Sequence, residues 1–420
     1  MGERRENLRG AGMRRGLGAV VVAASLLAAT ACSHGARAND RNQARPSAAS
    51  SSAPPGSVTI TPGDGTADAS PRNPLAVTAA NATIESVTVV DGGGGQVKGQ
   101  LAADRRTWTT TDSLKYGTTY TATVTAADSG GKQISQASRF TTVKPANLTL
   151  PYLQANSYLS LSDRTTFGVG QPIVVRFDEK IPDRAAAEKS LQVTTEPKVT
   201  GAWHWYTDQE VHWRPKEYWA PGTKVTVRAN VYGVHLGGGL YGQQDNGASF
   251  VIADKHVAIA DDNTHHIQVF INDKLDRTVP TSMGKNERVR GSNGQWLDFR
   301  TRSGVHVVLG TESRTRMTGA SWGLGDDSYA LDVNYTTHLS YQGEYLHEAT
   351  WNVWKHGKQN DSHGCLNLGT TDAKWFMNTF IPGDIVEVKN TGIQLDNMDG
   401  LTDWNMPWQQ WLAGSALGES

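Results

Sequence analysis

Residues 362–368 read Ser-His-Gly-Cys-Leu-Asn-Leu and contain the residue type best suited to covalent chemistry, a cysteine. The chain has two cysteines, Cys32 and Cys365, and their placement does not suggest a disulfide framework. A thiol of ordinary pKa is only a few per cent thiolate at neutral pH, so a nucleophilic cysteine benefits from an imidazole base and from nearby N–H groups. Many lone cysteines are simply small buried hydrophobes. The neighbouring residues must decide between these interpretations.

Three histidines are candidates for the imidazole base: His347, His356 and His363. His363 lies two residues before Cys365, and in an extended segment both side chains would lie on one face. His347 lies further upstream, and a sheet could bring it alongside the cysteine. Because Gly364 lets the backbone approach a substrate closely, the N–H groups of Gly364 and Cys365 are candidates for an oxyanion hole.

The elements around this stretch are expected to be mainly β. From about residue 256 the sequence predicts strands separated by longer loops. One short helix is predicted after the cysteine, over residues 372–380, with Thr370 or Thr371 as its N-cap and Pro382-Gly383 ending it. The reactive stretch is therefore predicted on a loop between a strand region and this helix.

The preceding part of the chain predicts two tandem immunoglobulin-like β-sandwiches, over residues 57–144 and 145–253. Short Val/Thr/Tyr-rich runs alternate there with turn residues. A tryptophan followed at the same spacing by a glycine turn and a strand occurs twice, as Trp108 with Gly117 and as Trp213 with Gly222. No cysteine pair joins the predicted sheets, so the likeness to antibody domains stops at the architecture. These sandwiches are expected to act as a spacer.

The N-terminal segment predicts export. Several arginines precede an apolar run over residues 17–31, which indicates a signal peptide over residues 1–31. Small residues before Cys32 resemble a bacterial lipobox, so we expect lipidation of Cys32 and a flexible linker over residues 32–56. Ordinary secretory cleavage nearby and an uncleaved anchor are the alternatives. The predicted location is extracytoplasmic, on the outer face of the cell membrane and facing the cell wall.

The other end of the chain and its overall charge set two further expectations. Trp404, Trp408 and Trp411 recur on one side of a predicted helical stripe, so residues 391–420 are expected to be a packing tail. A formal net charge of -1 gives no reason to expect nucleic acid as a partner.

The segment His347-Glu-Ala-Thr-Trp351, followed by the Ser-His-Gly-Cys run, resembles the L,D-transpeptidases of peptidoglycan, which are cysteine enzymes with a β-rich catalytic domain. The resemblance is strong over residues 256–390, within a predicted catalytic domain of residues 254–390. It extends to the lipobox, the tandem sandwiches and the tryptophan-rich tail of actinobacterial members.

This resemblance implies a role for each matching residue. Cys365 would be the acylated nucleophile and His347 its base, with the backbone carbonyl of Glu348 orienting the imidazole ring. His363, Gly364 and Cys365 would line the oxyanion site. The remaining residues would contact or enclose the donor substrate, and they are Met317, Tyr329, Gln342, Gly343, Trp351, Ser362 and Asn367.

Two departures from the family pattern stand out. Glu348 occupies a position where other members often have serine. Arg300-Thr301-Arg302-Ser303 replaces a Pro-Thr-Pro-like run, after an apparent insertion at residues 286–299.

The implied activity is formation of 3→3 cross-links between a donor tetrapeptide stem and an acceptor amine, with acylation of Cys365 by carbapenems. Thiolate attack followed by aminolysis needs no metal or organic cofactor. Three alternatives stay open: a wall-trimming L,D-carboxypeptidase or cysteine peptidase, a metal site using His347, His363 and Cys365, and a non-catalytic wall-binding lipoprotein.

Overall fold

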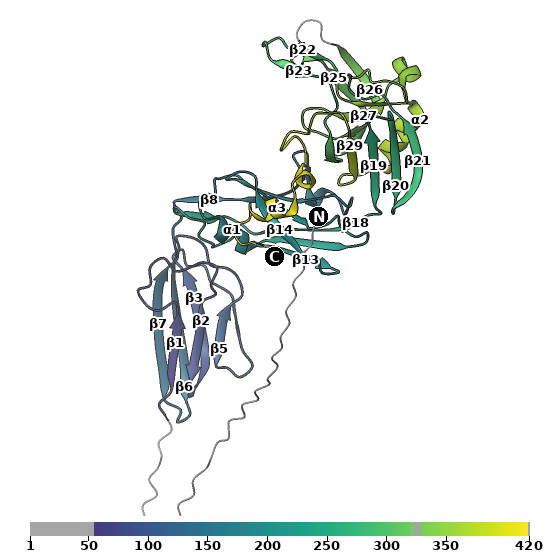
Figure 1. Ribbon diagram of the computed structural model, residues 1–420. Helices are drawn as coiled ribbons and strands as arrows, with labels where there is room; N and C mark the ends of the chain where they lie inside the picture. The colour runs from purple at the N-terminus through teal and green to yellow at the C-terminus, as the bar shows by residue number, and fades with distance from the viewer. Residues whose placement is uncertain (1–53, 321–322, 325–328, 419–420) are drawn as a thin grey trace, which may run out of the picture. The chain divides into compact units, whose positions relative to one another are not determined.

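The computed structural model describes residues 54–320, 323–324 and 329–418 (Figure 1). The predicted signal peptide, Cys32 and nearly all of the predicted linker lie outside the described residues. Within the described residues, no helix is both long enough and apolar enough to cross a membrane.

The first sandwich pairs a four-stranded sheet with a three-stranded one. The first sheet has the order β1 (Ser57–Thr61), β2 (Ala76–Ala80), β5 (Thr107–Thr110) and β4 (Gly99–Leu101). The second has the order β3 (Ala82–Asp91), β6 (Thr119–Asp128) and β7 (Gln133–Thr141). Alternate residues of β6 are buried, as a strand with one face on a core requires: Tyr120, Ala122, Val124 and Ala126.

The second sandwich is larger. One sheet has the order β10 (Leu159–Ser160), β9 (Pro151–Asn156), β12 (Ile173–Phe177), β15 (Glu210–Pro215) and β14 (Gly201–Trp205). The other has the order β11 (Thr166–Phe167), β18 (Asn246–Ile252), β16 (Lys224–Ala229) and β13 (Leu191–Glu196). A small sheet of β8 (Asn147–Thr149) and β17 (Leu240–Gly242), the helix α1 (Arg184–Ser190) and the 3-10 turn η1 (Leu161–Asp163) complete this part.

The sequence repeat corresponds to a repeated local structure. Gly117 and Gly222 both have positive φ, at 57° and 80°. Residues other than glycine rarely adopt this backbone conformation. In each sandwich the paired tryptophan also packs over a second glycine. A Cβ at Gly99 or at Gly201 would lie 2.0 Å from the indole of Trp108 or Trp213, respectively. The predicted tandem sandwich architecture is confirmed.

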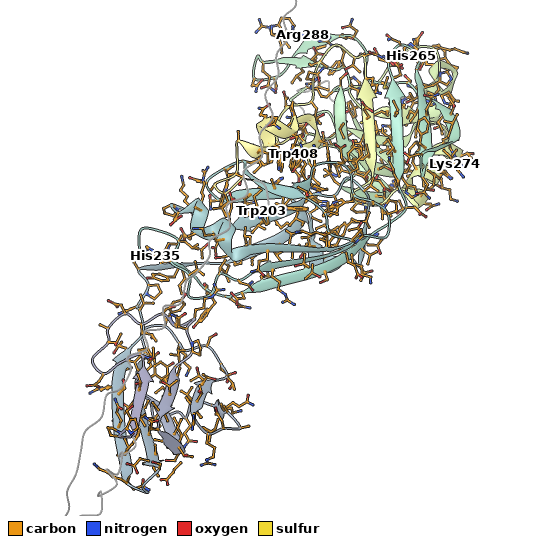
Figure 2. The ribbon with its side chains drawn as sticks, turned by 60° about the horizontal axis from the view of Figure 1, so that its bottom comes forward. Trp203, His235, His265, Lys274, Arg288 and Trp408 are labelled. Carbon is orange, nitrogen blue, oxygen red and sulfur yellow. The ribbon has the colours of Figure 1, made fainter. Side chains whose placement is uncertain are left out.

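The third domain, over residues 254–390, has two sheets and the α-helix α2 around a common core. One sheet has the order β21 (Lys274–Pro280), β20 (His266–Ile271), β19 (His256–Asp261), β29 (Ile385–Lys389) and β24 (Gly304–Val307). The other has the order β25 (Gly310–Thr318), β26 (Ala330–His338), β27 (Tyr345–Glu348) and β28 (Leu366–Leu368). The helix α2 (Thr370–Thr379) packs against β26 and β27, and its Phe376 is fully buried in the core. A hairpin of β22 (Arg288–Arg290) and β23 (Trp296–Asp298) extends from this domain, and Figure 2 labels its Arg288.

The start of α2 differs from the prediction. Its N-cap is Gly369, which has extended backbone angles and no side-chain capping bond, and Thr370 is the first helical residue. The threonines therefore do not cap the helix, because the last residues of β28 carry the chain directly into its first turn. The helix ends at Thr379, with Phe380 as its C-cap, just before Pro382-Gly383, as predicted.

The tryptophan-rich tail packs on the second sandwich. It comprises the 3-10 turn η5 (Asp403–Asn405) and the short helix α3 (Trp408–Leu412), which lies against β14. Trp411 is fully buried, and its indole N–H donates to the Ala202 carbonyl at 2.9 Å. The guanidinium of Arg214 lies 4.6 Å from the Trp411 ring centroid and 4.7 Å from that of Trp404.

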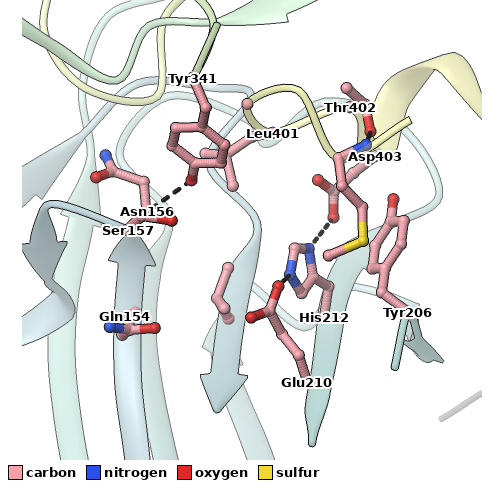
Figure 3. A pocket seen from close by; sticks show the side chains of 13 residues that line it. Gln154, Asn156, Ser157, Tyr206, Glu210, His212, Tyr341, Leu401, Thr402 and Asp403 are labelled. Carbon is pink, nitrogen blue, oxygen red and sulfur yellow. Dashed lines mark hydrogen bonds and ion pairs between the residues drawn. The ribbon is translucent and has the colours of Figure 1, made fainter. Parts of the chain in front are cut away.

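A buried charged cluster holds the same tail (Figure 3). His212 Nδ1 lies 2.8 Å from Asp403 Oδ1, and His212 Nε2 lies 3.1 Å from Glu210 Oε1. Burial by itself would lower the pKa of His212, but the two carboxylates outweigh it and raise this pKa to about 9. A protonated His212 therefore joins the tail to β15.

Candidate active site

Strand pairing brings the two principal catalytic candidates together. β27 and β28 run parallel, with Leu346 opposite Leu366 and His347 opposite Asn367. Cys365 directly precedes β28, so the sheet places it next to the strand that carries His347. Both side chains line one cavity of about 190 Å³.

The imidazole of His347 is buried and held in one orientation. Its Nδ1 lies 2.7 Å from the carbonyl oxygen of Glu348, the contact that the family resemblance implies. A protonated Nδ1 would donate to this carbonyl and leave Nε2 to accept a proton. Burial lowers the pKa of His347 to about 4, so the ring is neutral at pH 7. The Glu348 side chain instead accepts from Asn334 Nδ2 at 2.7 Å, which gives the unusual carboxylate a partner on β26.

The Cys365 thiol is neutral in the resting protein. Its side chain is partly exposed, yet the surrounding protein raises its pKa well above the ordinary value, mainly through burial. The Tyr345 backbone N–H acts in the opposite direction. The S–H donates to the Gly343 carbonyl at 3.7 Å. The pair at rest is thus a thiol and a neutral imidazole, and proton transfer to His347 must accompany attack.

The other two histidines have different surroundings. His356 is buried, and its Nε2 lies 3.1 Å from Asn352 Oδ1. His363 lines the cavity with Cys365, stacked on Tyr329 at 5.1 Å and edge-on to Phe299 at 4.5 Å between ring centroids.

Residues 363–365 lie on a loop, as predicted, and they do not form an extended segment. Gly364 has a φ of 130°, and the chain bends before β28 begins. Ser362 holds this bend, since its hydroxyl donates to the Cys365 carbonyl at 2.6 Å and accepts from the Gly364 N–H at 3.1 Å. The Gly364 N–H, a predicted oxyanion donor, therefore already has a partner in the free protein.

Cys365 opens onto a second, larger cavity of about 740 Å³. Cys365, Met317 and Tyr329 line both cavities. Gln342 and Gly343 line only the larger cavity, together with residues of the β22–β23 hairpin. His347 lines only the smaller one. The nucleophile is thus reached from two sides.

The remaining predicted substrate residues surround these cavities. Tyr329 is partly buried, and burial raises the pKa of its phenol to about 12. Trp351 is 55% exposed and stacks on His347 at 6.0 Å between ring centroids. Asn367 is buried against the smaller cavity, and its Oδ1 has no hydrogen-bond partner within the described residues. The Gln342 N–H donates to Asp399 Oδ1 at 2.7 Å, which fixes the turn before Gly343.

Sequence reasoning missed two positioning residues. Thr301 is buried, and its hydroxyl donates to the Gly364 carbonyl at 2.8 Å. Glu344 is also buried, and its Oε2 lies 3.0 Å from His306 Nε2. The sequence around Glu344 gives no signal for this role, because its histidine partner lies far away in the chain, on β24.

No group of three or more His, Cys, Asp or Glu side chains is arranged to hold a metal ion within the part of the chain that the structure describes.

Comparison with known proteins agrees with this arrangement. Residues 255–388 match the L,D-transpeptidase catalytic domain, and residues 66–235 match the bacterial Ig domain, a match that spans parts of both sandwiches. The chain is 41% identical to L,D-transpeptidase 2 of Mycobacterium tuberculosis (strain CDC 1551 / Oshkosh), over 84% of this chain and 83% of that protein. The chain belongs to the L,D-transpeptidase family.

Two further L,D-transpeptidases are similar to this chain. L,D-transpeptidase 5 of Mycobacterium tuberculosis (strain H37Rv) is 34% identical over 86% of this chain and 77% of its own length. A solved structure of L,D-transpeptidase 3 from Mycobacterium tuberculosis, in complex with a faropenem-derived adduct, is 26% identical and covers 57% of this chain and 98% of its own, with a TM-score of 0.45.

Proposed function

We propose that this L,D-transpeptidase joins two peptidoglycan stems through a thioester on Cys365. The sulfur attacks the carbonyl of the L-centre of diaminopimelate in a donor tetrapeptide as His347 Nε2 takes the thiol proton. The protonated ring then gives this proton to the leaving amine, and D-Ala departs. The side-chain amine of a second stem attacks the thioester, which forms a 3→3 cross-link and regenerates the thiol.

One observation carries the proposal. Cys365 and a neutral, oriented His347 line the same cavity, while Cys365 also faces a second cavity. A site reached from two sides suits a reaction with a donor and an acceptor. Water as acceptor would instead give a carboxypeptidase, and the amine product separates the two activities.

Acylation by carbapenems belongs to the same proposal, because these compounds offer an acyl carbonyl to the same thiol. The LD transpeptidase LdtMt1 has been solved in complex with imipenem. The test is the intact mass of residues 54–420 after incubation with a carbapenem, beside Cys365→Ala. One added drug mass on the wild type alone supports the mechanism, and a muropeptide cross-linking assay follows. Absence of an adduct on folded protein would favour a non-catalytic wall-binding lipoprotein.

We further propose that the enzyme is exported and anchored to the outer face of the cell membrane by lipid on Cys32. The charge order and apolar run of residues 1–31 support export, and the small residues before Cys32 support lipidation. Membrane fractionation of wild type and Cys32→Ala tests this, because loss of the lipid should release the variant into the soluble extracellular fraction.

A further inference from the structure

Residues 300–303, which depart from the family pattern, are hydrogen-bonded at two points near Cys365. One bond reaches the residue before Cys365, and the other reaches the residue after Gly343, which contacts the thiol. The Thr301 hydroxyl donates to the Gly364 carbonyl, directly before Cys365. The Arg302 backbone N–H donates to Glu344 Oε1 at 2.8 Å. Glu344 follows Gly343, whose carbonyl accepts from the Cys365 thiol. The position of Arg302 relative to the sulfur is therefore fixed by two short connections.

The Arg302 side chain lines the larger cavity together with Cys365. Its Nη1 donates to the carbonyl oxygens of Arg300 at 3.1 Å and Asp298 at 3.4 Å, which holds the guanidinium in place. Its side chain forms no ion pair with a carboxylate of the described residues. The guanidinium thus presents a positive charge to the cavity, and its other N–H donors suit a planar anion such as a carboxylate.

Neighbouring charges are already paired. The carboxylate of Asp298, which also lines the larger cavity, lies 2.6 Å from Arg300 Nη2. Arg316 lines the cavity as well, but it is exposed and lies 3.5 Å from Asp332 Oδ2. Arg302 is therefore the arginine of this cavity that forms no ion pair among the described residues, although its charge adds to that of Arg300 in lowering the pKa of Asp298.

The position of His347 determines which part of the donor stem lies in which cavity. The leaving amine must receive its proton from His347, which lines only the smaller cavity. The D-Ala side of the scissile bond therefore faces the smaller cavity, and the acyl part of the donor stem occupies the larger one. That acyl part carries carboxylates, one on the second centre of diaminopimelate and one on the residue before it.

We propose that Arg302 binds a carboxylate on the acyl side of the donor stem and selects donors that carry it. This inference rests on the proposed transpeptidase function. A charge-assisted hydrogen bond of this kind gives about a 10- to 100-fold preference for the free carboxylate over its primary amide. The same site would disfavour stems in which that carboxylate is amidated.

The test uses four synthetic donor tetrapeptide stems, in which the two carboxylates are each free or amidated. D-Ala release gives kcat/KM for the wild type, Arg302→Gln and Arg302→Lys. We expect the wild type to prefer a free carboxylate at one of the two positions by about 10- to 100-fold, which identifies the bound group. Arg302→Gln should abolish that preference and Arg302→Lys should keep part of it. Arg316→Gln is the matched control and should keep the wild-type ratio.

Each preference is a ratio of kcat/KM values that are measured with the same variant on different stems. A lower fraction of folded protein therefore does not change it. Equal loss with all four stems in Arg302→Gln, with the preference kept, overturns the inference and leaves a structural role. Release by the wild type without any carboxylate preference also overturns it but leaves the proposed function intact. No release from any stem by a wild type that forms no carbapenem adduct overturns the proposed function itself.

Discussion

His347 Nδ1 lies 2.7 Å from the carbonyl oxygen of Glu348, the residue that follows it in the chain. A backbone carbonyl accepts a hydrogen bond but carries no full charge, so it orients the ring and raises the pKa of His347 by less than burial lowers it. Burial then dominates and lowers the pKa of His347 to about 4. The enzyme therefore has a base that stays neutral in mildly acidic solution.

The first prediction is the pH profile of acylation. Because His347 protonates only near pH 4, the rate of carbapenem adduct formation should be flat from about pH 5 to 7.5 and fall below about pH 5. Mass-spectrometric time courses across this range measure it. An inflection near the ordinary histidine pKa of about 6.5 would contradict the prediction. Melting temperatures at each pH separate loss of the base from loss of the fold.

The second prediction concerns the identity of the base. His347→Gln should slow acylation by about 100-fold or more, because a positioned general base contributes at least that factor. His356→Gln is the matched control, since His356 is also buried but contacts Asn352 and does not line the cavity that contains Cys365 and His347. Its acylation rate should stay within a few-fold of wild type. Equal rates in the two variants would remove His347 from the mechanism.

The third prediction concerns the bend before the nucleophile. Ser362→Ala removes the hydroxyl that joins the Gly364 N–H to the Cys365 carbonyl. We expect a loss of about 1–3 kcal/mol in the free energy of unfolding, because two buried polar groups lose their partner, and slower acylation by about tenfold. Denaturant unfolding and adduct kinetics measure the two effects. Ser362→Thr keeps the hydroxyl and should restore both; an alanine variant with wild-type kinetics would show that the bend needs no such support.

The sequence predicted the elements and the reactive pair, but not the contacts that connect them. Period-two strands and glycine turns are local features, so the sandwiches could be inferred from the chain alone. The residues by themselves left three histidines open as the base of Cys365, and it was the family resemblance that implied His347. The roles of Thr301 and Glu344 depend on partners far away in sequence, Gly364 and His306. The loop was predicted, but its bend at Gly364 was not, because a spacing of two residues is compatible with both a strand and a turn.

The contacts of the C-terminal tail could not be predicted from the sequence either. The spacing of its tryptophans predicted a packing segment, but its partner on the second sandwich depends on Arg214 and His212, which have no such signal in sequence. Asp403 alone, in the segment between residues 400 and 405, gives no indication that it is buried beside a histidine. Only the folded chain brings these charges together.

The last prediction concerns stability at alkaline pH. The pKa of His212 is raised to about 9 in the folded protein, against about 6.5 in an unfolded chain. Its stabilising contribution is therefore complete below about pH 6.5 and is lost as pH rises towards and through about 9. The melting temperature of the wild type should fall between pH 6.5 and 9.5 by more than that of His212→Asn, which has no titrating group at position 212.

His212→Asn should itself be less stable at pH 6.5 by about 3–5 kcal/mol, because Asp403 then remains buried without its cation. The double variant His212→Asn/Asp403→Asn removes both charges and should recover part of this loss. Calorimetric scans of the three proteins at both pH values provide the measurement. Parallel pH dependence in wild type and His212→Asn would mean that His212 is neutral in the folded protein, and the tail would then be held by contacts other than this ion pair.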